Sequence, residues 1–327
     1  MNKKKRLVLI DGHSVVFRAF YAIPYLTDPD GQQVNAVYGF ALILLNVITD
    51  LEPTQIAVTF DTSKPTFRHT DFAEYKAQRK ETPSELIGQM DRVHEVVEAL
   101  NIPVFEVEGF EADDVIGTLS GQASKKQDVE TVIVTGDQDQ FQLVIDDMVK
   151  VWMPARGKKP AVMYGSDEVV GKLGVRPDQV PDYKGLAGDS SDNIPGVRGI
   201  GPTTAVRILR EFESIEEMYR FLDKIPDGKS DHRVTECTES QKQRLGRAGI
   251  TASVLKKLVE GREMAEKSKM LATIITDVPI ELDLEACKVS GYNKDEVIKL
   301  FDKLGFKSLI GKLPADEFEL GVQEALF

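Results

Sequence analysis

Short runs of apolar and β-branched residues alternate with helical patterns through the first half of the chain. These runs cover residues 7–10, 56–60, 103–107 and 131–135. The stretch 35–51 is apolar on nearly all sides, and 86–100 carries apolar residues at helical spacing. Strands that alternate with helices form βαβ units and parallel sheets. The pattern predicts an α/β core with a mostly parallel sheet, in which 35–51 is a buried helix.

Other segments complete the predicted outline. Thr82-Pro83-Ser84-Glu85 has the form of a capping box with proline at the first helical position, so we expect a helix to begin there. Residues 226–249 are polar and poor in apolar periodicity, which indicates an exposed loop or an insertion. Residues 293–309 have one apolar face and predict a small closing helix.

An acidic residue follows the end of each predicted strand. The four are Asp11, Asp61, Glu111 and Asp137. A single aspartate in such a place is commonly a turn former or a helix N-cap, so one acid alone does not discriminate. In an open parallel sheet, however, the carboxyl ends of the strands lie at one edge, and ligands bind there. Because four separate segments repeat the pattern, we expect the four carboxylates to converge at this edge.

More carboxylates accompany these positions. Glu111 and Asp114 share one face of a predicted helix. Asp137 and Asp139 point the same way if their segment is extended. The acidic set also contains Asp113, Asp189 and Asp192. Carboxylates in such number repel one another unless divalent cations neutralise them, and ligands that are all oxygen favour Mg²⁺ or Mn²⁺.

A basic segment lies between the second strand and the 86–100 helix. Residues 64–80 carry five basic residues against two acids, with Phe67, Phe72 and Tyr75 interleaved. Cations mixed with aromatic rings suit a strand of nucleic acid, whose phosphates contact the cations and whose bases stack on the rings. The alternative is a solvated surface helix with a few buried aromatics.

The second half contains a glycine-rich turn that leads into a helical stretch. Gly196, Gly199 and Gly201 permit a tight hairpin whose backbone N–H groups can approach phosphate beside a helix N-terminus. Residues 198–210 contain three arginines and no acid. This pattern is typical of a helix-hairpin-helix, which holds the DNA backbone without reading sequence. Residues 242–269 hold eight basic residues against three acids, which indicates either a solvated face or an extension of the DNA track.

The totals restrict the partners and the compartment. The chain has 327 residues, enough for one large or two fused domains, and a formal net charge of −12. A negative total argues against nucleic acid as a partner unless the acids gather where cations bind. Two cysteines without zinc-ligand spacing predict reduced thiols in a cytoplasmic protein. The apolar run after Arg6 stops at Asp11, too short for a signal peptide, and no later stretch is long enough to span a membrane.

Seven motifs in a fixed order resemble the 5′-nuclease (5′-3′ exonuclease) domain of bacterial DNA polymerase I, a member of the flap endonuclease superfamily. They are Ile10-Asp11-Gly12, Phe60-Asp61, Phe67-Arg68-His69, Tyr75-Lys76-Ala77-Gln78-Arg79, Gly109-Phe110-Glu111-Ala112-Asp113-Asp114, Val134-Thr135-Gly136-Asp137-Gln138-Asp139 and Gly188-Asp189-Ser190-Ser191-Asp192-Asn193. The likeness extends from about Leu7 to Pro314. Because it rests on the whole set rather than on one motif, it is highly specific.

The resemblance implies a PIN-like α/β nuclease core followed by a helical domain with a helix-hairpin-helix, also called a helix-three-turn-helix. We expect the core at 1–180, with a helical arch at about 64–85, the helical DNA-binding domain at 181–314, and an acidic tail or linker stub at 315–327. The resemblance places Asp11, Asp61, Glu111 and Asp113 around one divalent ion. It assigns Asp114, Asp137, Asp139, Asp189 and Asp192 to a second ion, directly or through water.

The same resemblance implies the reaction and its partners. Lys76 and Arg79 match a basic pair near the scissile phosphate and are the expected catalytic side chains. Expected DNA contacts are Arg68, Tyr75, Gly196, Arg198, Gly199, Gly201, Thr203 and Arg207. Two Mg²⁺ or Mn²⁺ ions, about 4 Å apart, would activate water and neutralise the leaving oxygen. The substrate would be DNA with a 5′ flap, a 5′ end or a branch, including RNA–DNA primer junctions, and K⁺ would bind at the hairpin.

Two departures and two rival functions stay open. Residues 226–249 are longer than the usual connection of the family. The chain ends at Phe327, where polymerase I continues, so it is either a free-standing monomeric nuclease or a fragment attached to polymerase domains. A PIN-type ribonuclease shares the acids but normally lacks the hairpin. A non-catalytic descendant would have lost one or more of the acids, and none is missing here.

Overall fold

The structure is a computed structural model that describes residues 5–126, 128–225, 237–289 and 291–319. Its sheet has the order β3-β2-β1-β4-β5-β6. The neighbours pair in parallel except for β5 and β6, which are antiparallel. The strands are β1 (Lys5–Asp11), β2 (Gln55–Thr59), β3 (Val104–Phe105), β4 (Val129–Val134), β5 (Val149–Met153) and β6 (Val162–Tyr164). The predicted α/β class with a mostly parallel sheet is confirmed.

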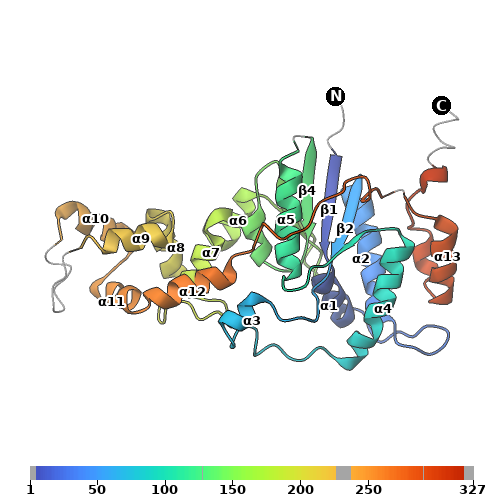
Figure 1. Cartoon of the computed structure of the whole chain (residues 1–327), viewed down its shortest axis with the longest axis horizontal. Coiled ribbons are helices and arrows are strands. Elements are labelled where there is room, and N and C mark those ends of the chain that lie inside the picture. The colour runs from blue at the N-terminus through green and yellow to red at the C-terminus, as the bar shows by residue number, and fades with distance from the viewer. Residues whose placement is uncertain (1–4, 127, 226–236, 290, 320–327) are drawn as a thin grey trace.

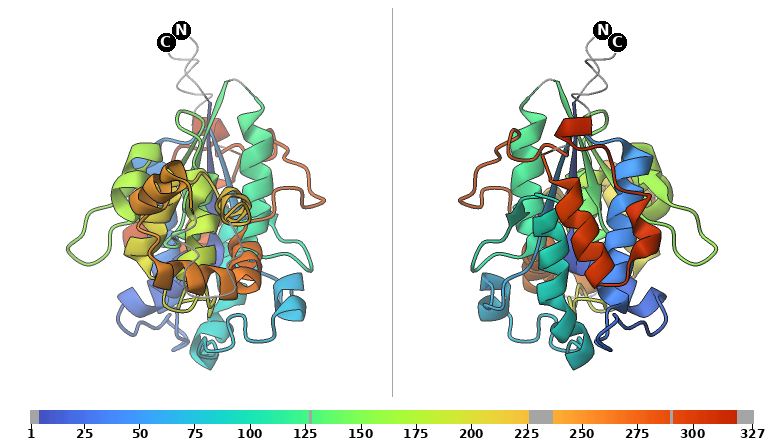
Figure 2. Two further views of the ribbon diagram at one scale, coloured as in Figure 1. Left: turned by 90° about the vertical axis from the view of Figure 1, so that its left-hand side faces the viewer. Right: turned by 90° about the vertical axis from the view of Figure 1, so that its right-hand side faces the viewer.

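Helices cover both faces of this sheet, so the central strands are buried on both sides (Figures 1 and 2). One face packs against α1 (Gly12–Ala22), α2 (Asn35–Leu51), α4 (Ser84–Ala99), α13 (Lys294–Lys303) and α14 (Lys307–Ile310). The other packs against α5 (Ala112–Ser124) and the 3-10 helix η1 (Asp139–Leu143). The predicted buried helix at 35–51 therefore matches α2 at both ends. The segment predicted as one closing helix, 293–309, forms two helices, α13 and α14.

The remaining helices extend away from one side of the sheet (Figure 1). They are α6 (Ser166–Leu173), the 3-10 helix η2 (Pro177–Gln179), α7 (Val180–Ala187), α8 (Pro202–Glu211), α9 (Ile215–Leu222), α10 (Glu239–Ala248), α11 (Ala252–Glu260) and α12 (Arg262–Ala272). Their buried side chains form one continuous core with the α5 face of the sheet. The chain then returns to the sheet, where the backbone N–H of Ile56 donates to the carbonyl of Cys287 at 2.7 Å. This shared core positions the helical part against the edge where β1 and β4 end.

Local predictions at helix ends and loops needed correction. The N-cap of α4 is Pro83 rather than Thr82, and it makes no side-chain capping hydrogen bond. Within the predicted loop at 226–249, residues 239–248 form α10, because the side chain of Thr238 caps the helix by accepting from the N–H of Gln241. Residues 226–236 lie outside the described part of the chain. The third strand is shorter than predicted and covers only β3.

The segment between β2 and α4 differs from a continuous helical arch. Within 64–85 the structure contains one short helix, α3 (Phe67–Asp71), followed by turns up to the start of α4 (Figure 1). Contacts of its backbone with the helical part hold it in place, since the N–H of Lys76 donates to the carbonyl of Asp192 at 3.0 Å. Lys76 adopts a left-handed backbone conformation, with φ at 54°, at this contact.

The beginning of the predicted tail packs on α13. The side chain of Lys294 forms an ion pair with Glu319 at 2.7 Å, and its backbone N–H donates to the carboxylate of Asp316. Residues 315–319 are therefore part of the folded structure rather than a free linker, and 320–327 lie outside the described residues. None of the described helices is long and apolar enough to cross a membrane.

Candidate active site

A cleft of about 1460 Å³ opens where the strands end and the helical part begins. Seven of the nine acids expected to bind metal line it, namely Asp11, Asp61, Glu111, Asp113, Asp137, Asp139 and Asp189. Lys76 and Arg79 line the same cleft. The convergence expected from strand ends and spacing therefore occurs, and it brings together segments that are far apart in sequence.

The first two acids belong to adjacent strands. Asp11 ends β1 and caps α1, because its Oδ1 accepts from the N–H of Ser14 at 3.0 Å. Its other oxygen accepts from the hydroxyl of Thr135 at 2.7 Å. Asp61 follows β2, and its Oδ1 accepts from the N–H of Ala112 at 2.7 Å. Asp11 is thus both the N-cap residue of α1 and one of the acids that line the cleft.

The start of α5 supplies the next pair of acids. Glu111 is its N-cap residue and Asp113 lies in its first turn. Asp113 accepts from the side-chain amide of Gln140 at 2.5 Å. Asp114 points away from the cleft, is fully buried, and accepts two hydrogen bonds from the guanidinium of Arg68 at 2.8 and 2.7 Å. Asp114 therefore serves an internal ion pair, which corrects its assignment to a metal.

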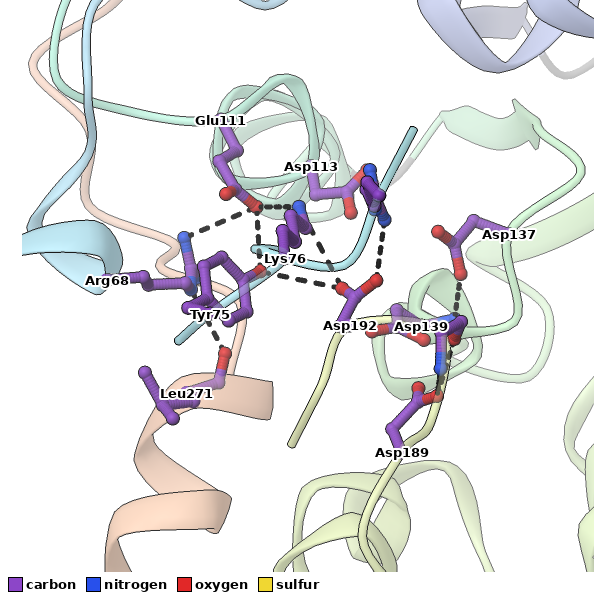
Figure 3. Close-up of polar contacts among 12 residues, drawn as sticks. Arg68, Tyr75, Lys76, Glu111, Asp113, Asp137, Asp139, Asp189, Asp192 and Leu271 are labelled. Carbon is purple, nitrogen blue, oxygen red and sulfur yellow. Dashed lines mark hydrogen bonds and ion pairs between the residues drawn. The ribbon is translucent and has the colours of Figure 1, made fainter. Parts of the chain in front are cut away.

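Lys76 and Arg79 contact carboxylates at the cleft, and Figure 3 shows Lys76 against Glu111 and Asp192. The ammonium of Lys76 lies 2.8 Å from Glu111 and 3.8 Å from Asp192. Arg79 donates to the other oxygen of Asp192 at 2.5 Å. Burial lowers the pKa of Lys76, but the carboxylates of Glu111 and Asp192 raise it further, so the net shift is upward and the side chain stays charged. Asp192 thus holds both cations at the cleft wall.

Asp137 and Asp139 lie on a turn into η1, so the extended geometry that was considered for them is absent. The Oδ1 of Asp137 accepts from the N–H of Asp139 at 2.9 Å. Asp139 also forms an ion pair with Lys184, which in turn contacts Asp189 at 2.5 Å. Lys184 lies on α7 and is 7% exposed. Both carboxylates line the cleft without an extended segment.

Burial and neighbouring carboxylates raise the pKa of three acids in the cleft. The pKa of Asp11 is raised to about 7, first by burial and then by the nearby charges of Asp61 and Asp137, although the hydrogen bonds from Ser14 and Thr135 lower it. The pKa of Asp139 rises to about 8, again through burial first and Asp137 second. Burial and the charge of Asp137 likewise raise the pKa of Asp113 well above its usual value. Anionic groups in this condition are stabilised by added positive charge.

One atom of the site is suited to a cation. The Oε1 of Glu111 is buried and has no hydrogen-bond partner, although an unsatisfied buried acceptor is costly. It lies beside acids that supply only oxygen donors, the donor set that Mg²⁺ and Mn²⁺ prefer. Within the described ranges, no three potential ligands already lie at coordination spacing. Several of these acids instead contact Lys76, Arg79 or Lys184, so the donor chemistry fits divalent ions without a preformed coordination sphere.

Burial corrects two of the expected DNA contacts. Arg68 is 2% exposed and Tyr75 is 4% exposed. The hydroxyl of Tyr75 donates to Glu111 at 3.2 Å, and Arg68 donates to Asp114 and to the carbonyl of Leu271. Neither side chain is available to phosphates or bases in this structure.

The expected hairpin connects α7 to α8, and most of its predicted contact residues are exposed. Arg198, Gly199, Gly201, Thr203 and Arg207 lie on the surface, and Gly201 is the N-cap residue of α8. Gly196 differs because it is buried. A Cβ there would lie 2.3 Å from the backbone nitrogen of Gly188, at a φ of 61°. Gly196 therefore shapes the turn rather than contacting a ligand.

Sequence reasoning missed two residues of the cleft. Lys184 stood in no recognised motif and could be found only through its contacts. His13 comes directly after the quoted motif Ile10-Asp11-Gly12 and was passed over. Its Nδ1 accepts from the backbone N–H of Asp61 at 3.0 Å, and burial lowers its pKa. The neutral ring therefore positions the segment that carries Asp61.

Two family models together match most of the chain. One is described as the 5′-3′ exonuclease N-terminal resolvase-like domain and matches residues 6–174. The other is described as the 5′-3′ exonuclease C-terminal SAM fold and matches residues 175–295. The chain belongs to the 5′-3′ exonuclease family. This confirms the resemblance drawn from the motifs, and with it the prediction of a nuclease.

Curated relatives of this 5′-3′ exonuclease chain are bacterial DNA polymerases I. The chain is 39% identical to that of Bacillus subtilis over 326 residues, which is 100% of this chain and 34% of the relative. It is 42% identical to that of Chloroflexus aurantiacus over 94% of this chain and 31% of the relative. The chain thus spans about a third of the length of the curated relatives it matches.

Solved structures confirm the two-part architecture of the 5′-3′ exonuclease chain. A complex of the bacteriophage T5 D15 flap endonuclease with DNA and metal ions matches with a TM-score of 0.56 and 19% identity, covering 82% of this chain and 99% of that one. The catalytic core of Rad2 in complex with a DNA substrate matches with a TM-score of 0.57 and 16% identity, covering 92% and 88%. At this identity the likeness establishes the fold alone.

Proposed function

We propose that this chain hydrolyses phosphodiester bonds of DNA at 5′ ends, 5′ flaps or branches, with divalent metal ions, and that it acts in replication and repair by removing flaps or primers. The observation that carries the proposal is the cleft itself, where acids from five separate segments meet Lys76 and Arg79 beside a shared core with the helical part. Family membership and the DNA complexes of similar folds support the choice of substrate.

The residues divide into two proposed ligand groups. Asp11, Asp61, Glu111 and Asp113 would hold one ion. Asp137, Asp139, Asp189 and Asp192 would hold the other, directly or through water, and Asp114 is left out because Arg68 neutralises it. When bound, two Mg²⁺ or Mn²⁺ ions would supply an activated water and neutralise the charge on the phosphate and the leaving oxygen. The unpartnered Oε1 of Glu111 supports the first group.

Lys76 and Arg79 are the proposed catalytic cations of the protein itself. Their charges lie against Glu111 and Asp192 at the cleft wall, within the space that a phosphate would enter. Positive charge fixed at this place stabilises the negative charge that develops on the phosphate oxygens. Because both side chains come from the segment between α3 and α4, the position of that segment controls the reaction.

The hairpin between α7 and α8 is the proposed duplex contact. Exposed Arg198 and Arg207 provide positive charge near the N-terminus of α8, whose free N–H groups favour phosphate. A K⁺ ion at this hairpin is part of the proposal, bound by carbonyls of the glycine turn. Contacts of this kind position the duplex without reading its sequence.

The test is cleavage of a duplex with a labelled 5′ flap, with Mg²⁺, with Mn²⁺ and with a chelator. We expect cleavage near the flap junction that requires the metal. Parallel reactions use the same duplex without a flap and a single-stranded RNA. They distinguish the proposed DNA nuclease from a PIN-type ribonuclease. Preferential cleavage of the RNA, or no metal-dependent cleavage of any DNA, would contradict the proposal. Asp137→Asn is the control for a contaminating nuclease.

A further inference from the structure

Lys184 is a buried cation inside the acidic cleft. Its side chain extends from α7 and contacts Asp139 on one side and Asp189 on the other. The two carboxylates come from different segments, the start of η1 and the turn after α7, and they face the same point in Figure 3. With 7% of its surface exposed, Lys184 is shielded from solvent. Its charge therefore acts on these two acids rather than on the surroundings.

This contact makes the two halves of the cleft unlike. In the first half, the hydrogen bonds to Asp11 and Asp113 come from uncharged donors, namely Ser14, Thr135 and Gln140. In the second half, Asp139 and Asp189 share the ammonium of Lys184, and Asp192 contacts Arg79. Lys76 adds positive charge to the first half through Glu111 at 2.8 Å, but it does not contact Asp11 or Asp113 there, whereas Asp139 and Asp189 share one buried ammonium.

We propose that Lys184 is a resident cation that occupies the Asp139–Asp189 pair in the free protein and competes there with a divalent ion. The ammonium and a metal ion would use the same carboxylate oxygens, so one must give way to the other. The backbone of Lys184 is fixed on α7, so its charge stays near the pair and repels an incoming ion even when the ammonium moves aside. Divalent binding at this pair is therefore weak until a substrate phosphate adds negative charge to the cleft.

The inference rests on the proposed metal-dependent function and makes Lys184 a positioning residue with a regulatory effect. Lys184 keeps the second half of the cleft compact when no DNA is bound. It also disfavours binding of both divalent ions while the substrate is absent. A protein of this design would bind one ion readily and the next one mainly together with DNA.

The test counts Mn²⁺ ions bound to the DNA-free protein, by electron paramagnetic resonance of the unbound Mn²⁺. Lys184→Met removes the charge and keeps much of the apolar stem. We expect the weaker Mn²⁺ site of this variant to tighten at least about tenfold, since a like charge a few ångströms away is lost. Lys184→Arg keeps the charge and should retain the binding curve of the unchanged protein. If Lys184→Met does not fold, Lys184→Gln provides the uncharged variant whose Mn²⁺ binding is compared with that of the unchanged protein.

Lys269 offers a matched control. It also bridges two carboxylates, Asp182 at 2.7 Å and Glu216 at 2.8 Å, and it does not line the cleft. Lys269→Met should therefore leave the Mn²⁺ curve unchanged. An unchanged or weaker second site in both uncharged Lys184 variants would overturn the inference about Lys184 alone. No Mn²⁺ binding by the unchanged protein would instead overturn the proposed metal-dependent function.

Discussion

The buried pair of Arg68 and Asp114 makes a quantitative prediction about stability. The guanidinium of Arg68 donates twice to Asp114, at 2.8 and 2.7 Å, and to the carbonyls of Leu271 and Thr273 at 3.0 and 2.7 Å. It therefore connects α3, α5 and the chain that follows α12. Arg68→Met would leave a fully buried carboxylate without its counter-charge, together with two carbonyls that lose their donor.

Breaking a buried ion pair from one side costs about 3–5 kcal/mol, so we expect the free energy of unfolding to fall by that amount. The measurement is urea unfolding followed by circular dichroism. Exposed Arg176 provides the control, because it also donates twice to a neighbouring acid, Asp178, at 3.0 and 2.9 Å. With that arginine side chain 50% exposed, Arg176→Met should cost less than about 1 kcal/mol.

The double variant Arg68→Met with Asp114→Leu separates loss of the pair from loss of one partner. Replacing both charges by apolar groups removes the unpaired carboxylate, so most of the stability should return. Strictly additive effects of the two substitutions would refute the reasoning. So would an Arg68→Met variant that is destabilised no more than Arg176→Met.

Three further predictions concern the cleft and the hairpin. Asp137→Asn should abolish cleavage of a 5′ flap while circular dichroism and DNA binding persist, and normal cleavage would remove this acid from the ligand set. Lys76→Ala should lower kcat more than it raises KM, since charge that acts on the transition state shows in turnover; a change in KM alone would make Lys76 a plain DNA contact. Gly199→Val combines a φ of 81° with a Cβ 2.9 Å from the ammonium of Lys257, so binding of duplex should weaken more than that of single strands. Equal loss on both substrates would make the hairpin only structural.

Much of the site was predictable because its acids are placed by local rules. Asp11 and Asp61 follow apolar runs that form strands, and parallel pairing brings the ends of those strands to one edge. Glu111 and Asp113 begin a helix at the same edge. Each position could be found from a few neighbouring residues, and the parallel topology of the sheet brings these positions to one edge. The expected convergence needed no side-chain contact to be known in advance.

The errors concern segments whose conformation depends on distant contacts. Residues 64–85 carry a pattern compatible with a helix, yet between α3 and α4 the segment forms turns over 73–78 and irregular chain, and it packs on the helical part through Lys76 and Asp192. Tyr75 is buried against Glu111 rather than exposed to bases. Local composition does not distinguish an aromatic residue that binds DNA from one that packs beneath the site.

The amino-acid sequence by itself determined which carboxylates could meet, since strands, helix starts and turns are encoded by neighbouring residues. Only the tertiary structure decided which of them are neutralised internally. Arg68 reaches Asp114 across 46 positions, and Lys184 reaches Asp139 across 45. The first pair joins α3 to α5, and the second joins α7 to the start of η1. Burial and direction rather than spacing select the partner in both. Tertiary packing also leaves Glu111 with one unpartnered oxygen at the cleft.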